Sequence, residues 1–288
     1  MKFILLLSLI TTFTIAKEIH VQGHRGARAV LPENTLEGFQ YAMDLGVGVL
    51  ELDLAVTMDD QVIISHDPVV NTKLCHFNRK NFPFSLLTLK QVKEIDCGSK
   101  KNPNFPKQKP IPKARIPTLA ELFEMVKSSQ SSFARKVQFN IEIKIFPQYP
   151  SLTPGPQKFA KLTYDVIKKY GMVERSIIQS FDYRPLVAIK ALDSRLRLAF
   201  LNGQSLPDFV PIAQRLKAHI ISPNQHWITK DQVQALNKIG VQTIPWTANT
   251  EKEWAHLVQI GVDGIITDDP EGLIRWLRKQ GLRSDKSL

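Results

Sequence analysis

The 288-residue sequence lacks several features that would assign it to common protein classes. Its N-terminal apolar run, Phe3 to Ile15, is too short to cross a bilayer and is interrupted by threonines. No later apolar segment reaches the length of a transmembrane helix. No helical segment carries a stripe of lysine and arginine interleaved with aromatics, and no DNA- or RNA-binding motif is present. No glycine-rich nucleotide fingerprint follows the first predicted strand. The sequence therefore gives no support for a membrane-spanning, nucleic-acid-binding or dinucleotide-binding protein.

Cysteine is also scarce, since Cys75 and Cys97 are the only two in the chain. Although His76 adjoins Cys75, no further ligands stand at zinc-finger spacing, so a zinc site is not expected. In an exported protein an even pair is a disulfide candidate, and closing a loop of about 20 residues is worth roughly 3 kcal/mol in the chain-entropy model. The alternative is two unrelated buried thiols.

Residues 1–16 have the pattern of a secretory signal peptide. Lys2 precedes the apolar run, and Thr14-Ile15-Ala16 is a small-x-small cleavage site before Lys17. The alternative is a buried first strand or helix, but Glu18 to Gln22 already supplies a first strand. We therefore expect an exported protein, either periplasmic or secreted.

The composition is that of a globular protein with an excess of positive charge. Hydrophobic residues make up 43% of the chain and charged residues 23%, which allows a large core. Lysine and arginine number 38 against 27 acidic residues, a net charge of +11, and the densest basic stretch is Lys100 to Arg115. We expect this charge to serve an anionic substrate such as a phosphoester, with at most peripheral contact to an anionic membrane surface. No nucleic-acid or protein partner is implied.

Strand-like and helix-like patterns alternate along most of the chain. The predicted strands are Glu18–Gln22, Val47–Val56, Gln61–Ser65, Val137–Ile143, Ser176–Gln179, Leu196–Phe200, Ala218–Ile221, Val241–Ile244 and Gly264–Ile266. The predicted helices are Leu36–Leu45, Leu119–Lys127, Pro156–Tyr170, Tyr183–Leu192, Pro207–Leu216, Lys230–Ile239, Lys252–Ile260 and Glu271–Lys279. When the short strand Gln61–Ser65 is left out, eight strands remain, and each is followed by one of the eight helices. Eight such βα units predict an α/β fold of the (β/α)₈ TIM barrel type. The alternative is an open doubly wound sheet, which the missing glycine fingerprint weakens.

Residues from about 69 to 116 interrupt this alternation. Prolines, lysines and asparagines accumulate there, and a structureless stretch of this length is uncommon unless it is functional or a subdomain. We expect a lobe inserted after the second βα unit, tied by Cys75 and Cys97 and lying over the site beside His66. Residues 17–288 would then form a single barrel domain.

The loop from Gly23 to Thr35, with the sequence GHRGARAVLPENT, follows the first predicted strand. It delivers four functional groups to the end of that strand, on His24, Arg25, Glu33 and Asn34. Each residue alone fits a turn with a helix cap, but all four at this spacing do not. Loops held by a rigid scaffold are common positions for catalytic groups.

Acidic residues follow other predicted strands, whose C-terminal ends would meet at one mouth of a barrel. Glu51 and Asp53 share one strand face, and Glu142 would arrive from the next barrel strand. Three carboxylates held close together repel one another unless a cation lies between them. Because oxygen ligands favour hard cations, we expect one divalent cation, Mg²⁺ or Ca²⁺. For a single Glu-x-Asp pair, the alternative is a solvated strand face.

Histidines and cations complete the predicted mouth. His24 and His66 are the only histidines predicted at strand ends there, and two such groups suit a general acid and base. Lys144 would act as a point charge on a phosphoryl oxygen, and Arg25 would offer a bidentate fork. Three further residues stand at predicted strand ends: Ser180, Trp246 and Asp268.

The order of these motifs resembles that of the glycerophosphodiester phosphodiesterase family. The matching segments are His24-Arg25-Gly26, Pro32–Thr35, Glu51-x-Asp53, His66-Asp67, Glu142-x-Lys144, Gln179–Phe181, Trp246–Asn249 and Gly261–Asp268. The resemblance implies a barrel hydrolase, dependent on a divalent cation, that cleaves deacylated phospholipids such as glycerophosphocholine into glycerol 3-phosphate and an alcohol. It also implies the site roles: Glu51, Asp53 and Glu142 as metal ligands, and Arg25, Lys144, Glu33, Asn34 and Trp246 as substrate-binding residues.

The sequence leaves the route and the substrate partly open. We expect the glycerol 2-hydroxyl to attack phosphorus and form a cyclic phosphate, which water then opens, while direct attack by water is the competing route. A second hypothesis keeps the site but takes lysophospholipids as substrates, in the manner of a lysophospholipase D. A third is a catalytically silent barrel that binds phosphodiesters.

Overall fold

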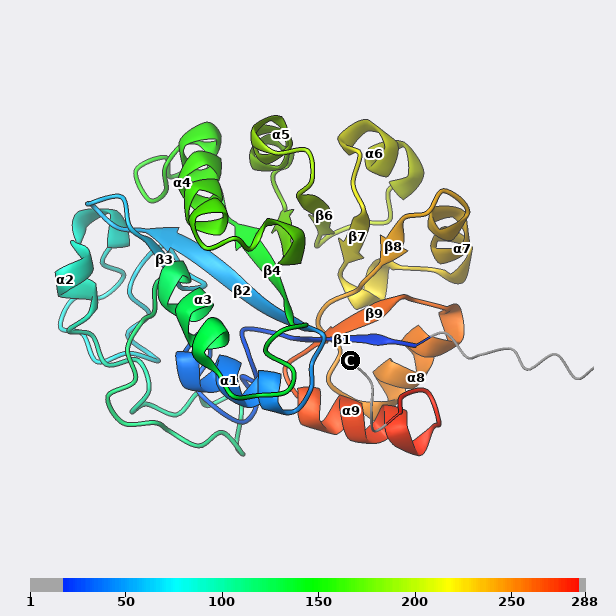
Figure 1. The fold of residues 1–288 in the computed structure, drawn as a ribbon, viewed down its shortest axis with the longest axis horizontal. Helices are drawn as coiled ribbons and strands as arrows, with labels where there is room; N and C mark the ends of the chain where they lie inside the picture. The colour runs from blue at the N-terminus through cyan, green and yellow to red at the C-terminus, as the bar shows by residue number, and fades with distance from the viewer. Residues whose placement is uncertain (1–17, 285–288) are drawn as a thin grey trace, which may run out of the picture.

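The chain folds into a barrel of parallel strands surrounded by helices, as the computed structural model of residues 18–284 shows (Figure 1). The strands are β1 (His20–Gly23), β2 (Val49–Val56), β3 (Val62–Ile64), β4 (Gln138–Ile143), β5 (Ser176–Ser180), β6 (Arg197–Asn202), β7 (Ile220–Pro223), β8 (Gln242–Thr243) and β9 (Gly264–Thr267). Eight of them pair in the order β8-β7-β6-β5-β4-β2-β1-β9, and β3 pairs antiparallel with β2 outside this path. The predicted TIM barrel is thus confirmed.

The seam between β8 and β9 closes through backbone hydrogen bonds. The N–H of Asp263 donates to the carbonyl of Thr243 at 2.9 Å, and the N–H of Ile266 donates to that of Pro245 at 3.0 Å. β8 is shorter than the predicted Val241–Ile244, although the N–H groups of Ile244 and Trp246 still donate to carbonyls of β7. The barrel is therefore closed by backbone hydrogen bonds on both sides of β8.

A helix follows each barrel strand. The helices are α1 (Leu36–Asp44), α3 (Leu119–Ser128), α4 (Pro156–Lys169), α5 (Tyr183–Leu192), α6 (Phe209–Leu216), α7 (Lys230–Lys238), α8 (Glu251–Ile260) and α9 (Pro270–Lys279). Their starts match the predicted ones within two residues, because side-chain caps define all but that of α4, which begins with Pro156. At Thr118 and Thr250, the hydroxyl accepts from the N–H three residues later and the glutamate there accepts from the threonine N–H.

The hydrophobic core has two layers, one on each side of the strands. Outward residues such as Leu50, Leu52 and Leu54 are buried beneath the helices. Inward residues from six positions around the ring form a separate cluster that fills the barrel: Val49, Ile177, Ala199, Ile220, Ile244 and Ile266. Since side chains alternate along a strand, Glu51 and Asp53 lie on the same inner face as Val49, farther along β2. An apolar plug therefore supports the polar mouth.

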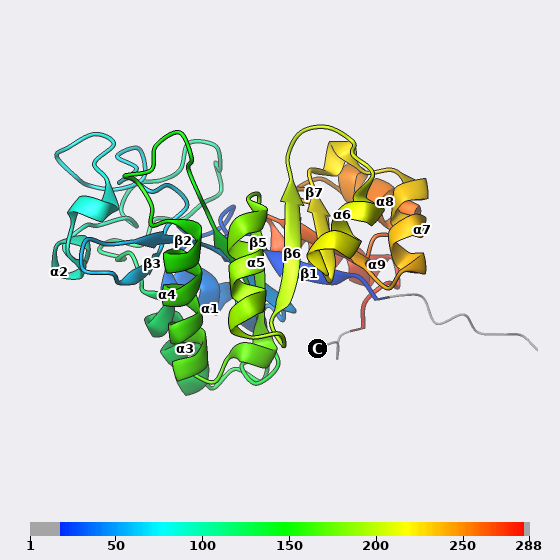
Figure 2. The same cartoon turned by 90° about the horizontal axis from the view of Figure 1, so that it is seen from above.

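The inserted lobe, residues 69–116, lies beside the barrel and reaches the same end as the loops that follow β6 and β7 (Figure 2). It stands within the second βα unit, between the β2–β3 hairpin and α3, rather than after that unit. The short helix α2 (Leu89–Val92) and the disulfide between Cys75 and Cys97 belong to it. Its small core packs on Ala55 and Ile63, the outer ends of the hairpin.

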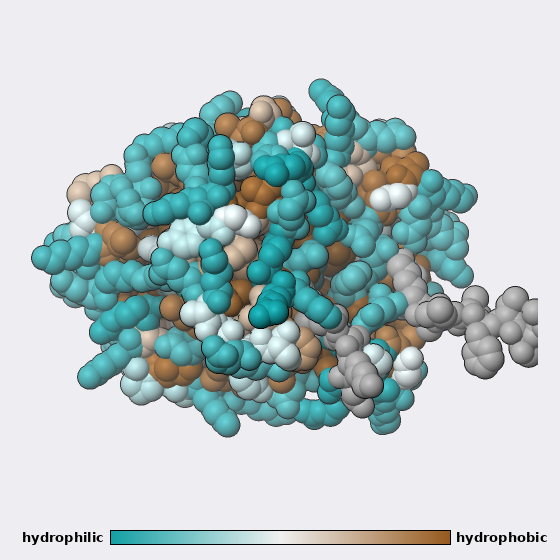
Figure 3. Space-filling view, viewed as in Figure 1, coloured by the Kyte–Doolittle hydropathy of each residue, from teal (hydrophilic) through white to brown (hydrophobic). Residues whose placement is uncertain are grey.

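The predicted signal peptide, residues 1–16, lies outside the residues that the structure describes. Within residues 18–284, no helix combines the length and the apolar character needed to cross a membrane. Hydrophilic residues cover most of the face seen in Figure 3, which is viewed from the same side as Figure 1.

Candidate active site

The opening loop turns sharply enough to place His24 beside the inner face of β2. A Cβ atom on Gly23 would lie 2.3 Å from the carbonyl oxygen of Gly26, so only glycine permits this approach. Arg25 has a φ of 52°, which is uncommon for a residue with a side chain. In this conformation the Arg25 N–H donates to Glu51 Oε2 at 2.9 Å, and His24 Nε2 lies 4.0 Å from the same oxygen.

Three buried carboxylates converge at the mouth, as predicted. Parallel pairing of β2 with β4 sets Asp53 opposite Glu142, and Glu51 lies two residues before Asp53 on the same face. One oxygen of each lies within 4.8 Å of the others. The barrel register therefore assembles an oxygen-rich cluster from residues that are far apart in the sequence.

The pKa values of the three carboxyl groups are shifted in different directions. Burial, with repulsion from Asp53, raises the pKa of Glu142 to about 7 although Lys144 opposes it. Burial and the two neighbouring carboxylates likewise raise the pKa of Glu51 well above its usual value. Burial would also raise the pKa of Asp53, but Lys144 and Arg25 hold it well below its usual range. Without a further positive charge, the protein therefore disfavours ionisation of Glu51 and Glu142.

The carboxylates fit a divalent cation. Glu142 Oε1 is buried and has no hydrogen-bond partner among the described residues, so it retains a free lone pair toward the cluster. Three carboxylates supply the hard oxygen ligands that Mg²⁺ and Ca²⁺ take. A cation bound there would compensate the repulsion that raises both glutamate pKa values.

Two cations adjoin the carboxylates. Lys144 Nζ lies 2.8 Å from Asp53 Oδ1 and 3.6 Å from Glu142 Oε2. The Arg25 guanidinium lies 2.8 Å from Glu33 Oε1 and 3.3 Å from Asp53 Oδ2. Burial would lower the pKa of Lys144, but Asp53 outweighs this and raises it. Both side chains are therefore charged and fixed.

Each predicted catalytic histidine contacts a carboxylate through Nδ1. His24 Nδ1 lies 2.5 Å from Asp268 Oδ1, and Asn249 donates to the other oxygen of Asp268 at 2.8 Å. His66 Nδ1 lies 2.9 Å from Asp67 Oδ1. Because a carboxylate accepts, Nδ1 donates in each pair, which leaves both Nε2 atoms available for proton transfer.

His66 lines the mouth although the strand before it is not one of the eight barrel strands. It follows β3, which runs antiparallel to β2 and returns the chain toward the barrel. The Ser65 N–H donates to the Asp53 carbonyl at 2.9 Å, so the next residue, His66, enters the mouth beside the carboxylates.

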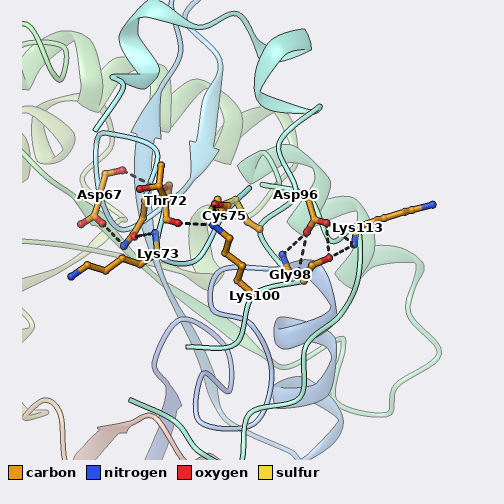
Figure 4. The surroundings of a disulfide bond; sticks show 12 residues. Asp67, Thr72, Lys73, Cys75, Asp96, Gly98, Lys100 and Lys113 are labelled. Carbon is orange, nitrogen blue, oxygen red and sulfur yellow. Dashed lines mark hydrogen bonds between the residues drawn. A yellow bond between two sulfur atoms is a disulfide. The ribbon is translucent and has the colours of Figure 1, made fainter. Parts of the chain in front are cut away.

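Residues of the lobe hold Asp67, the partner of His66, in place. Asn71 Nδ2 donates to Asp67 Oδ2 at 3.0 Å, while Asn71 Oδ1 accepts from the Lys73 N–H at 3.1 Å. The Cys75 N–H donates to the Asn71 carbonyl at 2.8 Å. Figure 4 shows Asp67 and the disulfide in this part of the lobe, with Lys100 donating to the carbonyls of Thr72 and Cys75.

Two connected hollows meet at these residues. A cavity of about 320 Å³ is lined by His24, Glu51, His66 and Trp246 among others. A larger groove of about 820 Å³ is lined by both polar and apolar residues, and its apolar members are Pro68, Ile145, Phe146, Pro147, Phe181 and Tyr183. His66, Glu142 and Lys144 border both. The two hollows therefore adjoin one another at His66.

The predicted substrate-binding residues divide into two groups. Arg25, Lys144 and Trp246 line the 320 Å³ cavity, and the Trp246 ring meets Phe181 edge to face at 5.5 Å. Glu33 and Asn34 do not line it. Asn34 Nδ2 donates to Asp53 Oδ2 at 3.0 Å, and Glu33 forms ion pairs with Arg25 and Arg28. Both residues therefore hold other side chains of the site in place.

Several residues of the site were not in the predicted set. Asp67 and Asp268 were noted in the sequence, one beside His66 and the other at a predicted strand end, but neither was assigned a role. Arg28 lines the cavity and stacks its guanidinium 4.9 Å from the ring centre of Phe105 in the lobe, but no sequence pattern marks it. No sequence pattern marks Asn71 either.

A buried amide network beneath the carboxylates was also missed. Asn140 Nδ2 donates to the side-chain oxygens of Gln22 and Gln179, each at 2.9 Å. Gln179 Nε2 in turn donates to Glu51 Oε1 at 2.7 Å. Gln22 and Asn140 each stand two residues before a site residue on the same strand face, which is the signal that would have found them.

Comparison with known proteins agrees with this geometry. The model of the Glycerophosphoryl diester phosphodiesterase family matches residues 24–272. A glycerophosphodiester phosphodiesterase from Caldanaerobacter subterraneus subsp. tengcongensis is 34% identical over 262 residues, which are 91% of this chain and 98% of that protein.

Solved structures share the fold. A protein from Silicibacter pomeroyi DSS-3 superposes with a TM-score of 0.83 at 23% identity, over 92% of this chain and 95% of that one. A phosphodiesterase from Oleispira antarctica, in complex with the product sn-glycerol-3-phosphate, has a TM-score of 0.75 at 22% identity, over 91% and 97%. Together with the family match across most of its length, these likenesses show that the chain belongs to the glycerophosphoryl diester phosphodiesterase family of enzymes.

Proposed function

We propose that this enzyme hydrolyses glycerophosphodiesters to glycerol 3-phosphate and an alcohol, using His24 and His66 as its acid–base pair. One observation carries the proposal: two carboxylate-paired histidines and two fixed cations line one cavity of about 320 Å³, together with two members of a cluster of three carboxylates. A phosphodiester is an anion whose cleavage needs charge stabilisation and two proton transfers, and this set of groups supplies both.

The charged groups divide the work on the phosphoryl oxygens. A divalent cation held by Glu51, Asp53 and Glu142, either Mg²⁺ or Ca²⁺, would supply electrostatic stabilisation of a phosphoryl oxygen. Lys144 and Arg25 line the same cavity and place positive charge opposite the remaining oxygens. Asp53 and Glu33 hold these two cations in place.

The positions of the histidines suggest their roles. His66 borders both hollows, whereas His24 lines only the cavity next to Glu51. We assign His24 as the base that removes the proton from the attacking hydroxyl. His66 is the acid that gives a proton to the alkoxide oxygen as the phosphorus–oxygen bond breaks and the alcohol leaves into the groove.

A substrate with an activated leaving group tests this assignment. With glycerol 3-phospho-p-nitrophenyl ester, nitrophenolate leaves without a proton, so His66→Ala should release it at nearly the wild-type rate in the first turnover. His24→Ala should stay slower by at least about 10²-fold on every substrate. Equal losses for both variants on the activated ester would refute the assignment, and full activity of both on glycerophosphocholine would refute the proposal.

The nucleophile decides between two routes. We propose attack by the glycerol 2-hydroxyl, giving a cyclic phosphate that water opens with the histidine roles reversed. A 2-deoxy substrate should then be turned over at less than about one hundredth of the normal rate. Unimpaired turnover would establish direct attack by water instead.

The groove favours lysophospholipids as a second candidate substrate class. Its apolar wall, with Ile145, Phe146 and Phe181, is larger than a polar head group needs, and pockets of several hundred cubic ångströms suit apolar ligands. Phe146→Asp would lower turnover of micellar lysophosphatidylcholine while leaving that of glycerophosphocholine within about twofold. Failure of the wild-type enzyme to release choline from the lysolipid would exclude this class.

We also propose that residues 1–16 direct export to the periplasm or the medium. Mass spectrometry of the protein from its native host should then find Lys17 at the N-terminus. An intact Met1 in the exported fraction would contradict cleavage.

A further inference from the structure

The lobe carries most of the net charge of the protein. Residues 69–116 contain eleven lysines and arginines but only two acidic residues, a formal charge of +9. The other residues of the chain together carry +2 of the total of +11. The excess charge is therefore concentrated in one part of the molecule.

Most of these basic side chains face solvent. Eight of the eleven belong to exposed residues: Lys73, Arg79, Lys80, Lys90, Lys101, Lys107, Lys109 and Lys113. Lys93 pairs with Glu121, and Lys100 donates to two backbone carbonyls, so these two serve the lobe's own structure. Exposed like charges repel one another and attract an anionic surface.

Exposed apolar side chains continue from the lobe to the groove. Leu86 in the lobe is 57% exposed and Tyr149 in the β4–α4 loop is 63% exposed. The Ser85 hydroxyl donates to the Ser151 carbonyl at 2.8 Å, which joins these two loops. Phe181 and Tyr183, 48% and 57% exposed, border the groove itself. We call Leu86, Tyr149, Phe181 and Tyr183 the apolar rim.

We propose that the basic lobe and the apolar rim dock this enzyme on an anionic phospholipid bilayer. Stable attachment of a peripheral protein needs two signals, and here they are basic charge for the lipid phosphates and apolar side chains for the interface. Tyrosine is enriched where membrane meets water, since its ring is apolar and its hydroxyl polar. Because Phe181 and Tyr183 of the rim also border the groove, docking through the rim brings the groove to the bilayer surface.

The rim favours a bilayer over a nucleic acid. Aromatic rings beside basic residues also suit single-stranded nucleic acids, where bases stack on them. Leu86 offers no ring for stacking, however, and the sequence carries no nucleic-acid-binding motif. The proposal does not depend on which phosphodiester the enzyme cleaves.

Vesicle sedimentation of the purified exported form tests the proposal. The wild-type protein should bind vesicles in which about one third of the lipid is phosphatidylglycerol, release them at high salt, and bind pure phosphatidylcholine weakly. Changing Lys101, Lys107 and Lys109 together to Gln should reduce the partition coefficient about 100-fold, since each lysine near an anionic surface contributes roughly a fivefold factor. The matched control, Gln at the exposed Lys238, Lys252 and Lys279 on the barrel helices, should change it less than about twofold.

A second pair of variants tests the rim. Leu86→Ser with Tyr149→Ser should weaken vesicle binding at least about tenfold. The control Ile239→Ser, at an exposed position after α7, should not weaken it. Unchanged melting temperatures and unchanged kcat/KM on soluble glycerophosphocholine would show that all variants are folded and that the lobe does not merely steer substrate.

Several outcomes would overturn the proposal. These are equal binding to neutral vesicles, an equal loss in the lysine control, and a fall in kcat/KM on the soluble substrate that matches the loss of vesicle binding. Tighter binding to a single-stranded oligonucleotide than to the anionic vesicles, with no effect of the Leu86 and Tyr149 changes, would identify a polyanion site instead.

Discussion

The two histidines of the site have the same kind of partner but stand in different surroundings. The His24 side chain is 12% exposed, and its Asp268 is fixed by Asn249 and the end of β9, all parts of the barrel. The His66 side chain is 38% exposed, and its Asp67 is fixed by Asn71 of the lobe. One half of the acid–base pair therefore depends on the barrel core, and the other depends on an insertion.

This difference teaches that the lobe is part of the active site and not an appendage. Its contacts reach both sides of the mouth, because Gln108 donates to the carbonyls of Arg28 and Leu31 while Asn71 holds Asp67. A disturbance of the lobe should therefore act on His66 first, whereas a disturbance at Asp268 should act on His24. The following experiments test that division.

The largest effect is expected from removal of the metal, which both halves share. Chelation should abolish turnover, and restored Mg²⁺ or Ca²⁺ at about 100 times its Kd should stabilise the fold by about 2.7 kcal/mol in thermal unfolding. Glu142→Gln should lose this shift, and its metal-free form should melt higher than the wild type because one repelling carboxylate is gone. Glu94→Gln, at an exposed position in the lobe, is the control. A metal-dependent shift that survives Glu142→Gln would remove Glu142 from the ligand set.

Loss of either histidine comes next. His24→Ala and His66→Ala should each lower kcat on glycerophosphocholine by about 10²- to 10⁴-fold, the usual scale of acid–base catalysis. His226→Ala, an exposed histidine after β7, should leave kcat unchanged. If only one of the two catalytic variants lost activity, the pair would have to be replaced by a single acid–base group.

The carboxylate partners should rank by their exposure. Asp268→Asn should cost about 10- to 100-fold in kcat, the equivalent of a hydrogen bond to a charged group. Asp67→Asn should cost less, because its side chain is 36% exposed against 8% for Asp268 and water can replace the lost contact. Steady-state kinetics with both variants measure the ratio. The reverse order would show that the lobe constrains its histidine more tightly than the barrel does.

Asn71 should have a smaller effect that is confined to His66. Asn71→Ala removes one hydrogen bond to Asp67, so we expect about a fivefold loss of kcat with little change in KM. First-turnover release of nitrophenolate from the activated ester should be nearly normal, because that step needs no acid. Asn78→Ala, exposed in the same lobe, serves as the control. An equal loss on both substrates would assign Asn71 a general structural role.

The smallest effect on turnover is expected from the disulfide. Changing Cys75 and Cys97 to Ser opens a loop with a sequence separation of 22 residues, and should destabilise the fold by about 3 kcal/mol in the chain-entropy model. Near room temperature kcat should fall less than about twofold, since Asn71 still reaches Asp67. Hydrogen exchange should accelerate in residues 69–116 and not in the barrel strands. Equal acceleration in both would show that the lobe and the barrel unfold as one unit.

The barrel, its element boundaries and the carboxylate pair on β2 follow from the sequence by itself. These features depend on local physics: side chains alternate along a strand, apolar residues repeat along a helix, and threonine caps mark helix starts. Glu51 and Asp53 share a face whatever the rest of the chain does. The order of βα units then restricts the topology to very few alternatives.

Only the tertiary structure determined which residues far apart in the sequence contact one another. His24 and Asp268 are 244 residues apart and meet because β1 pairs with β9 when the barrel closes. His66 reaches the mouth through an antiparallel hairpin, and Asn34 turns toward Asp53 instead of the substrate. Such contacts depend on strand register and on the packing of an insertion, which no local pattern encodes. The chain thus specifies the types of groups at the mouth locally, and closure of the barrel determines which of them touch.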